Sequence, residues 1–249
     1  MYTFTDDFIG YHEEHRDEIY TGYDSLEKYN ESLNVTPKDW YYRDNPIYYK
    51  RNNLGHRCKN PEEIDLSNYF LVAGCSHSEG IGLHLEDTYP YLLSKELNCD
   101  YYNLSLGGSG IDVFSYNLLT WIAKINQKPK FLILQIPNIL RYSTFEDPYV
   151  LVHGLWTTQP NKSDFLILGD QINYFSSQYM LAKKLIKNHI NVPIIDVFSS
   201  RSDLSKIVDD PAQSVIAYEI DLARDRMHMG KSSNKNTFNK ILEKVQPLL

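Results

Sequence analysis

Short apolar runs alternate with helical patterns along most of the chain, from about residue 68 onward. Glycine or proline closes several of the runs, as Gly74 closes the first and Pro137 the third. Runs of this length and composition are typical of strands that are buried on both faces of a parallel sheet. We expect such strands at residues 69–73, 101–106, 131–136, 192–198 and 215–218.

Helical periodicity fills the intervals between these runs. Apolar side chains form stripes on residues 112–126 and 176–189, and a third stripe follows the i, i+3, i+4, i+7 pattern within residues 238–245. Strands that alternate with helices predict a parallel sheet covered by helices on both faces. The expected fold class is therefore α/β, with three layers.

Length and composition narrow the class of protein further. A chain of 249 residues holds one domain, with or without an elaboration, and its 42% hydrophobic and 23% charged residues are ordinary globular values. No stretch approaches the roughly 18 consecutive apolar residues of a membrane span, and the first residues lack the features of a secretory signal. The three cysteines, Cys58, Cys75 and Cys99, form no C-x-x-C motif. We expect a soluble, cytoplasmic protein with no membrane partner.

Negative charge is concentrated at the start of the chain. Residues 1–50 carry 11 acidic and 5 basic side chains, whereas the rest is nearly neutral, with 20 basic and 21 acidic side chains. Since nucleic-acid binding needs a basic surface, nucleic acid is not an expected partner. Residues 1–50 also hold 9 of the 20 tyrosines. We predict an acidic, tyrosine-rich extension at 1–66 that packs on a domain at 67–249, either at the rim of a cleft or in an oligomer contact. The oligomeric state stays open.

Candidate chemistry lies where the expected strands end, because functional groups gather at the carboxyl edge of a parallel sheet. Ser76 lies two residues past the first closing glycine, at a turn into a helix that exposes its hydroxyl and its backbone N–H. Gly108 follows the second strand, and Asn138 follows the third. Asp225 precedes His228 by three residues, a spacing that lets it bind one imidazole nitrogen and leaves the other free to act as a base.

The order and spacing of these residues resemble the SGNH (GDSL-type) hydrolase superfamily over roughly residues 68–249. The best parts are G-C-S-H-S-E-G-I-G, which begins at Gly74, and D-R-M-H-M-G, which begins at Asp225. Residues 103–108, with a glycine five positions after an asparagine, fit the second sequence block of the family. The segment N-N-L-G-H-R at 52–57 also looks like a short lead-in found in some acyl-transfer and acyl-esterase members.

This resemblance implies a flavodoxin-like three-layer fold and the hydrolysis or transfer of ester-linked acyl groups without a metal or cofactor. It implies that Ser76 is the nucleophile, that His228 is the base and that Asp225 orients the base. The oxyanion donors it implies are the backbone N–H groups of Ser76 and Gly108 and the side chain of Asn138.

The chain departs from the family pattern in two places. The Gly-Asp-Ser of the family reads Gly74-Cys75-Ser76 here, and the missing Asp is not the triad acid. The Gly-x-Asn-Asp of the third block reads Ile136-Pro137-Asn138-Ile139, so the glycine and the Asp that follows the asparagine are both missing. Gln135 or Arg141 could therefore take the place of Asn138, and both are candidates for the cleft lining together with His77.

Other motifs are weaker candidates for function. His12-Glu13-Glu14-His15 is favoured as a solvated surface over a metal site, because it lacks the H-E-x-x-H order. Residues 230–232 lack the first glycine of a phosphate loop, and residues 107–110 lack dinucleotide-site spacing. Cys75 is favoured as a small buried residue over a reactive thiol.

The sequence thus favours a serine esterase that acts on a small-molecule or carbohydrate acyl ester, with O-acetyl groups of carbohydrate as one candidate. The alternative is a catalytically degenerate protein of the same fold, with a binding or structural role in a larger assembly.

Overall fold

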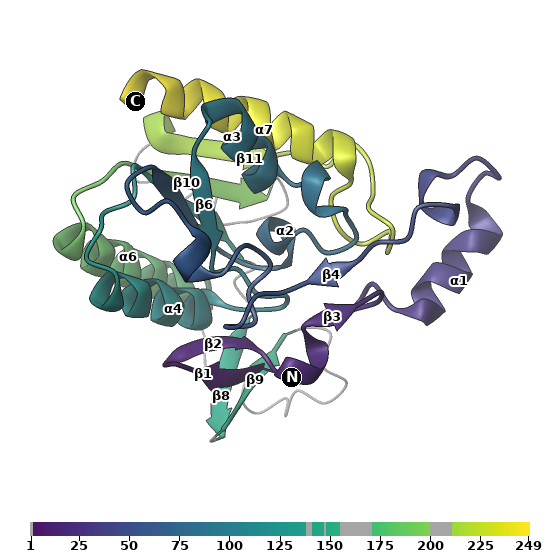
Figure 1. The fold of residues 1–249 in the computed structure, drawn as a ribbon, viewed down its shortest axis with the longest axis horizontal. Coiled ribbons are helices and arrows are strands. Elements are labelled where there is room, and N and C mark those ends of the chain that lie inside the picture. Colours follow the sequence, from purple (N-terminus) through teal and green to yellow (C-terminus); the bar gives the residue numbers. More distant parts are fainter. Residues whose placement is uncertain (1, 138–140, 147, 155–170, 200–210) are drawn as a thin grey trace.

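A five-stranded parallel sheet runs through the centre of the computed structural model, which describes residues 2–137, 141–146, 148–154, 171–199 and 211–249 (Figure 1). The strands lie in the order β11-β10-β7-β5-β6, and every neighbouring pair is parallel. Counted along the chain within this sheet, that is the flavodoxin-like order 2-1-3-4-5. The strands are β5 (Tyr69–Ala73), β6 (Asp100–Asn103), β7 (Leu132–Ile136), β10 (Ile194–Ser199) and β11 (Ser214–Ala217).

Helices cover both faces of this sheet, as Figure 1 shows. On one face lie α4 (Ile111–Lys124) and α6 (Gln171–His189), and on the other lie α3 (Tyr89–Leu97) and α7 (Lys231–Val245). The predicted α/β class, with three layers and a flavodoxin-like sheet, is confirmed.

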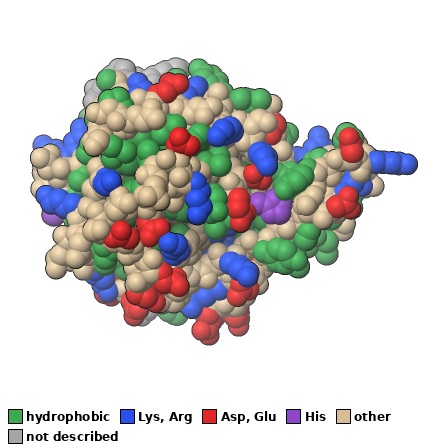
Figure 2. Space-filling model, turned by 45° about the horizontal axis from the view of Figure 1, so that its top comes forward, with side chains coloured by type: hydrophobic (Ala, Val, Ile, Leu, Met, Phe, Trp, Pro, Cys, Tyr) green, Lys and Arg blue, Asp and Glu red, His purple; other side chains and the backbone are tan. Residues whose placement is uncertain are grey.

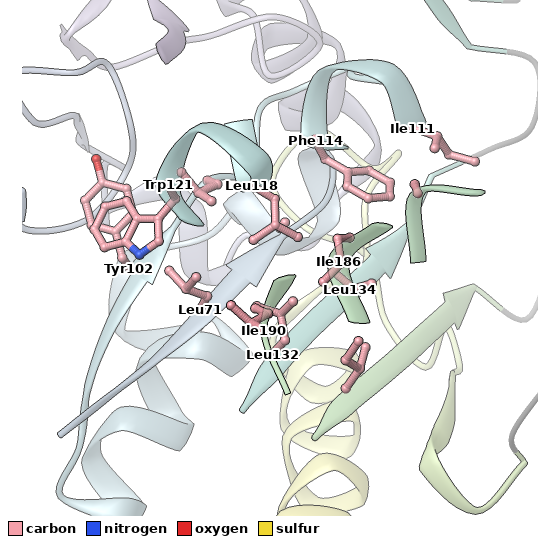
Figure 3. Close-up of a cluster of buried hydrophobic side chains, with 14 of the residues drawn as sticks. Leu71, Tyr102, Ile111, Phe114, Leu118, Trp121, Leu132, Leu134, Ile186 and Ile190 are labelled. Atoms are coloured by element: carbon pink, nitrogen blue, oxygen red, sulfur yellow. The ribbon is translucent and has the colours of Figure 1, made fainter. Parts of the chain in front are cut away.

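Two apolar cores explain why the sheet needs both helical layers. Successive side chains of a strand point to opposite faces, so Leu71 joins the core under α4 and α6 while Val72 joins the core under α3 and α7. Figure 3 shows the first core, where the rings of Tyr102 and Trp121 stack with centroids 4.1 Å apart. Because both faces are covered, the strands read as continuous apolar runs in the sequence.

A second, antiparallel sheet lies beside the first and was not predicted. Its order is β2-β1-β9-β8, so it joins the start of the chain to a hairpin that follows β7. Tyr2 pairs with Tyr11 on one side and with Val150 on the other. These strands have only four or five residues each, which is too few for a clear periodic pattern. They are β1 (Tyr2–Thr5), β2 (Phe8–Tyr11), β8 (Tyr142–Glu146) and β9 (Tyr149–His153).

Residues 2–66 pack on the body of the molecule through several apolar side chains. Phe8, Leu54 and Ile64 lie in the core under α4 and α6. Only the part around α1 (Leu26–Val35) projects from the body (Figure 1). On the face shown in Figure 2, acidic and basic side chains are interspersed. The two-stranded sheet of this region is β3 (Asp17–Glu18) with β4 (Tyr49–Lys50).

Short helices complete the described structure. α2 (Ser76–Glu79) follows β5 directly, at the carboxyl edge where β5 and β7 lie side by side. In a 2-1-3-4-5 sheet this is the switch point, where the chain leaves in opposite directions and a crevice forms. None of the helices in these ranges is both long and apolar enough to span a membrane. The 3-10 helices are η1 (Glu13–His15), η2 (Tyr41–Arg43), η3 (Pro61–Glu63), η4 (Leu85–Asp87), η6 (Pro211–Gln213) and η7 (Gln246–Leu248).

Candidate active site

Ser76 is the first residue of α2, and its side chain lies at the switch point of the sheet. The residue is 4% exposed, and the left-handed Gly80 ends the helix after a single turn. The buried Arg57 fastens that turn, because its guanidinium donates to the carbonyls of Glu79 and Gly80 at 3.2 and 2.6 Å. Ser76 therefore lies on a single helical turn whose last carbonyl groups are hydrogen-bonded to Arg57.

His228 and Asp225 lie in the loop that precedes α7, and this loop brings them to Ser76. His228 Nε2 is 2.8 Å from Ser76 Oγ. On the other side of the ring, His228 Nδ1 is hydrogen-bonded to Asp225 Oδ2. The second oxygen of Asp225 accepts hydrogen bonds from the backbone N–H groups of Met227 and His228, both at 3.0 Å. The three side chains form a continuous Ser–His–Asp chain.

Asp225 is buried, and the environment keeps it ionised. Burial alone raises the pKa of a carboxyl group, but the hydrogen bond and charge of His228, together with two backbone amides, outweigh it and lower the pKa of Asp225 below its ordinary value. An ionised Asp225 accepts the Nδ1 proton, so Nε2 carries the lone pair that faces the Ser76 hydroxyl. The electrostatics therefore favour the tautomer in which His228 can act as a base.

Backbone amides that could donate to an oxyanion lie in the same cavity as Ser76. Gly107 and Gly108 line the same cavity as Ser76 and His228. Gly108 has φ +75°, a left-handed conformation that favours glycine. In the part of the chain that the structure describes, neither the Ser76 amide nor the Gly108 amide donates to another residue. Asn138, the third predicted donor, lies outside the described residues.

The cavity over Ser76 has a volume of about 1160 Å³, and much of its wall comes from the N-terminal region. The hairpin of β8 and β9 supplies another part through Val150, Leu151 and Val152. The cavity is thus bordered by the N-terminal region and by the hairpin that follows β7. The lining residues from the N-terminal region include Tyr2, Tyr11, Glu18, Tyr20, Tyr23 and Leu26.

Two of the three residues proposed for the cleft lining lie there. His77 borders the cavity, and its ring lies 5.2 Å from that of His228, edge to face. Arg141 borders it as well. Gln135 does not: it is fully buried at the end of β7, and its amide donates to the Val197 carbonyl at 3.4 Å. The expectation for Gln135 was wrong, because its position in the strand directs the side chain into the packed interior.

The other motifs considered in the sequence have local structural roles. His12 accepts from the backbone of Glu14 at the start of η1, and His15 Nδ1 lies 2.7 Å from Glu18. Within the described ranges, no three His, Cys, Asp or Glu side chains are grouped as metal ligands. Cys75 is 1% exposed.

Two buried ionic groups that support the site were not predicted. Glu79 binds Arg51 at 3.0 Å and Tyr11 at 3.2 Å, which links α2 to the N-terminal region. Asp24 binds Arg224, the residue before Asp225, at 2.7 Å. A buried charge needs a partner, but the sequence does not show which distant residue supplies it. The excess of acidic residues before position 50 is a signal for Asp24 alone, and it does not name the partner.

Solved structures of esterases and of lipolytic proteins of the G-D-S-L family are similar to this chain, whereas no family model and no curated protein matches it. An acetyl xylan esterase from the rumen bacterium Butyrivibrio proteoclasticus is 14% identical over 82% of this chain and 67% of its own, with a TM-score of 0.49. A family two carbohydrate esterase from Clostridium thermocellum, in complex with cellohexaose, is 10% identical over 75% and 65%, with a TM-score of 0.49. A lipolytic protein of the G-D-S-L family from Veillonella parvula is 11% identical over 70% and 96%, with a TM-score of 0.46. At these identities and TM-scores the matches report what the chain is similar to, and they carry no conclusion about its activity or substrate.

Proposed function

We propose that this chain is a serine esterase of the SGNH type, which hydrolyses or transfers ester-linked acyl groups. The observation that carries the proposal is the hydrogen-bonded chain from Ser76 Oγ through His228 to Asp225, which lies in the wall of a large cavity. A nucleophile, a base and an orienting acid in this geometry are the parts that acyl transfer requires.

In the first half of the reaction, Ser76 Oγ attacks the acyl carbon of the ester and its proton passes to His228 Nε2. The carbonyl electron pair moves to oxygen, and the amides of Ser76 and Gly108 donate hydrogen bonds to the resulting oxyanion. When the intermediate collapses, the bond between the acyl carbon and the leaving oxygen breaks, and His228 returns the proton to that oxygen. An alcohol departs, and the acyl group remains on Ser76.

In the second half, water enters and attacks the acyl carbon while His228 takes one of its protons. The bond to Ser76 Oγ then breaks, Oγ recovers the proton from His228, and a carboxylic acid is released. If the hydroxyl of an acceptor molecule replaces water, the same steps transfer the acyl group to that acceptor.

The size of the cavity supports a substrate whose alcohol part is large. Within that class, an O-acetylated carbohydrate is the preferred candidate. A volume of about 1160 Å³ is somewhat larger than most small-molecule sites, and Tyr2, Tyr11, Tyr20 and Tyr23 contribute to its wall. Tyrosine combines an apolar ring with a polar tip, which suits the faces and hydroxyl groups of a sugar.

The test combines a serine-directed fluorophosphonate with turnover of p-nitrophenyl acetate. We expect peptide mapping to place the label on Ser76, and we expect Ser76→Ala to lose ~10³-fold or more of the turnover rate. Ser78→Ala is the matched control: Ser78 lies in the same short helix, where its hydroxyl bonds Ser105 at 2.8 Å inside the protein, and its loss should leave labelling intact.

Two results would contradict the proposal. Full turnover by Ser76→Ala would show that Ser76 is not the nucleophile. Absence of both labelling and turnover in the folded wild-type protein, over a panel of acyl esters, would favour the non-catalytic binding protein instead.

A further inference from the structure

The carbonyl of Gly107 has an unusual partner, the hydroxyl of Tyr2. The two residues are 105 positions apart, and the hydroxyl of Tyr2 donates to this oxygen. A carbonyl oxygen can only accept, so the phenolic proton lies on this bond. The oxygen belongs to the same peptide unit as the N–H of Gly108, the group to which we assign one of the oxyanion hydrogen bonds.

The planarity of the peptide connects the two groups. In a trans peptide the C=O and the following N–H lie in one plane and point in opposite directions. A hydrogen bond that fixes the Gly107 oxygen therefore fixes the direction of the Gly108 N–H as well. Glycine on both sides of this bond leaves the peptide free to rotate unless something outside the loop holds it.

We propose that Tyr2 is a positioning residue for the oxyanion site, which it orients by holding the peptide between Gly107 and Gly108. The inference rests on the proposed function, because it assigns Tyr2 a role in the same acyl-transfer site. Tyr2 acts through the peptide and forms no bond with the reacting atoms.

The position of Tyr2 is itself rigid. Strand β1 is an inner strand of the small sheet, so Tyr2 pairs with Tyr11 in β2 and with Val150 in β9. The rings of Tyr2 and Tyr11 meet edge to face, with centroids 4.7 Å apart. Tyr2 is 6% exposed. The backbone and the ring of Tyr2 are therefore both held in place, and so is its hydroxyl.

The Tyr2 hydroxyl is connected through Tyr11 to a buried ion pair. The Tyr11 hydroxyl is 3.3 Å from that of Tyr2 and donates to Glu79 at 3.2 Å, and Glu79 in turn pairs with Arg51 at 3.0 Å. A Cβ atom on Gly107 would lie 3.0 Å from the Tyr11 hydroxyl and 3.4 Å from that of Tyr2. A side chain at position 107 would therefore crowd both tyrosine hydroxyls. Glycine at this position lets the hydroxyls of Tyr2 and Tyr11 approach the backbone closely.

The Tyr2 hydroxyl also stays protonated at neutral pH. Burial, followed by the nearby Tyr11 and Glu79, raises the pKa of Tyr2 well above its ordinary value. The donor to Gly107 is thus permanent, and no change of pH in the working range removes it.

The test is Tyr2→Phe, which removes the hydroxyl and keeps the ring. Loss of an oxyanion donor costs ~10²–10³ in rate, and a donor that is present but free to turn should cost about 10- to 50-fold in kcat. KM should change by less than about twofold, because the ring that borders the cavity remains and only transition-state binding is affected.

A matched control separates positioning from stability. Tyr69 is also buried, at 1% exposed, and its hydroxyl also donates to a backbone carbonyl, that of Gln127, at 2.6 Å. It lies at the start of β5, at the end of the strand away from the cleft. Tyr69→Phe should lower the melting temperature about as much as Tyr2→Phe, while kcat stays at the wild-type value.

A boronic acid provides a readout that a purely structural role would not change. Ser76 Oγ adds to boron, its proton passes to His228, and the tetrahedral boronate places a negatively charged group in the oxyanion site. Tyr2→Phe should weaken inhibition by the same factor as it lowers kcat/KM, whereas Tyr69→Phe should leave it unchanged.

The outcomes are distinct from those that decide the proposed function. If Ser76→Ala abolishes turnover but Tyr2→Phe keeps wild-type kcat and boronate affinity, the role of Tyr2 is refuted and the esterase stands. If Tyr2→Phe raises KM alone, Tyr2 binds substrate and does not position the donor. If Ser76→Ala is fully active, both proposals fail.

Discussion

At the scale of single residues, the site depends on a carboxylate that is buried and nevertheless ionised. Asp225 receives two backbone N–H bonds on one oxygen and the imidazole of His228 on the other. Every favourable contact is with its charged form, which is why its pKa is lowered in spite of burial. The arrangement fixes both the orientation and the tautomer of His228.

Replacing this charge should disable the base without removing it. Asp225→Asn keeps the size of the side chain but presents an amide to Nδ1, which favours the tautomer whose Nε2 carries a proton. We expect kcat for p-nitrophenyl acetate to fall ~10²- to 10⁴-fold.

Asp221→Asn is the matched control for this substitution. Asp221 lies four residues away and accepts from the backbone N–H groups of Ser232 and Ser233 at 3.0 and 2.8 Å, at the start of α7. Its replacement should lower the melting temperature and leave kcat unchanged. A wild-type kcat in Asp225→Asn would exclude Asp225 as the orienting acid.

At the scale of elements, one ion pair connects the N-terminal region to the loop that holds His228. The Asp24 carboxylate accepts from the Arg224 guanidinium and also bonds the Tyr49 hydroxyl, which accepts from the Gly82 N–H at 2.7 Å. Arg224 N–H also donates to the Gly82 carbonyl at 3.0 Å. These buried contacts connect the N-terminal region, the segment around Gly82 and the loop of Arg224, which is adjacent to Asp225.

Removing the charge of Asp24 should destabilise the whole molecule, because it leaves Arg224 buried without its counter-ion. We expect Asp24→Asn to lower the free energy of unfolding by about 3 kcal/mol or more, measured by urea denaturation. kcat should also fall, because Arg224 precedes Asp225.

An exposed ion pair supplies the comparison. Asp7 pairs with Lys124 at 2.8 Å, but its side chain is 74% exposed, so Asp7→Asn should change stability very little. Equal effects of Asp7→Asn and Asp24→Asn would show that burial does not decide the strength of the Asp24–Arg224 pair.

At the scale of the whole molecule, His56 connects the N-terminal region to the interior. It is fully buried and contacts the Ile9 carbonyl at 3.1 Å, the Tyr102 hydroxyl at 3.0 Å and the Asn117 amide at 3.3 Å. None of these partners is charged. Burial lowers the pKa of His56 from 6.5 to about 4, so the ring is neutral in the folded protein at neutral pH.

This shift makes stability depend on pH in one direction. Between pH 6.5 and about 4 the unfolded chain binds a proton at His56 that the folded chain does not bind, so acid favours unfolding. The free energy of unfolding that depends on a neutral His56 is fully present above pH 6.5 and is lost as the pH falls to about 4. This loss amounts to about 3 kcal/mol in total. Urea denaturation at pH 7 and at pH 4.5 should show the loss.

His56→Gln should flatten this part of the stability curve, although it lowers stability at pH 7. Protonation of carboxylates at low pH also lowers the free energy of unfolding, and it does so in the wild-type protein and in His56→Gln alike. The difference between the two curves therefore isolates His56. Parallel curves for wild type and variant would show that the ring is not the titrating group.

The sequence by itself determined the central sheet and the residues that could carry chemistry. Strands buried on both faces must be apolar throughout, so β5 and β7 were visible as local runs. The turn at Ser76 and the three-residue spacing from Asp225 to His228 are local as well. Such features need no knowledge of distant contacts.

Only the tertiary structure decided how these residues are brought together and supported. The bond from Tyr2 to Gly107 spans 105 positions, and the pair of Asp24 and Arg224 spans 200. The antiparallel sheet joins the start of the chain to residues 142–153. Contacts of this kind leave no periodic pattern, because each depends on a single side chain whose partner is chosen by the topology of the fold.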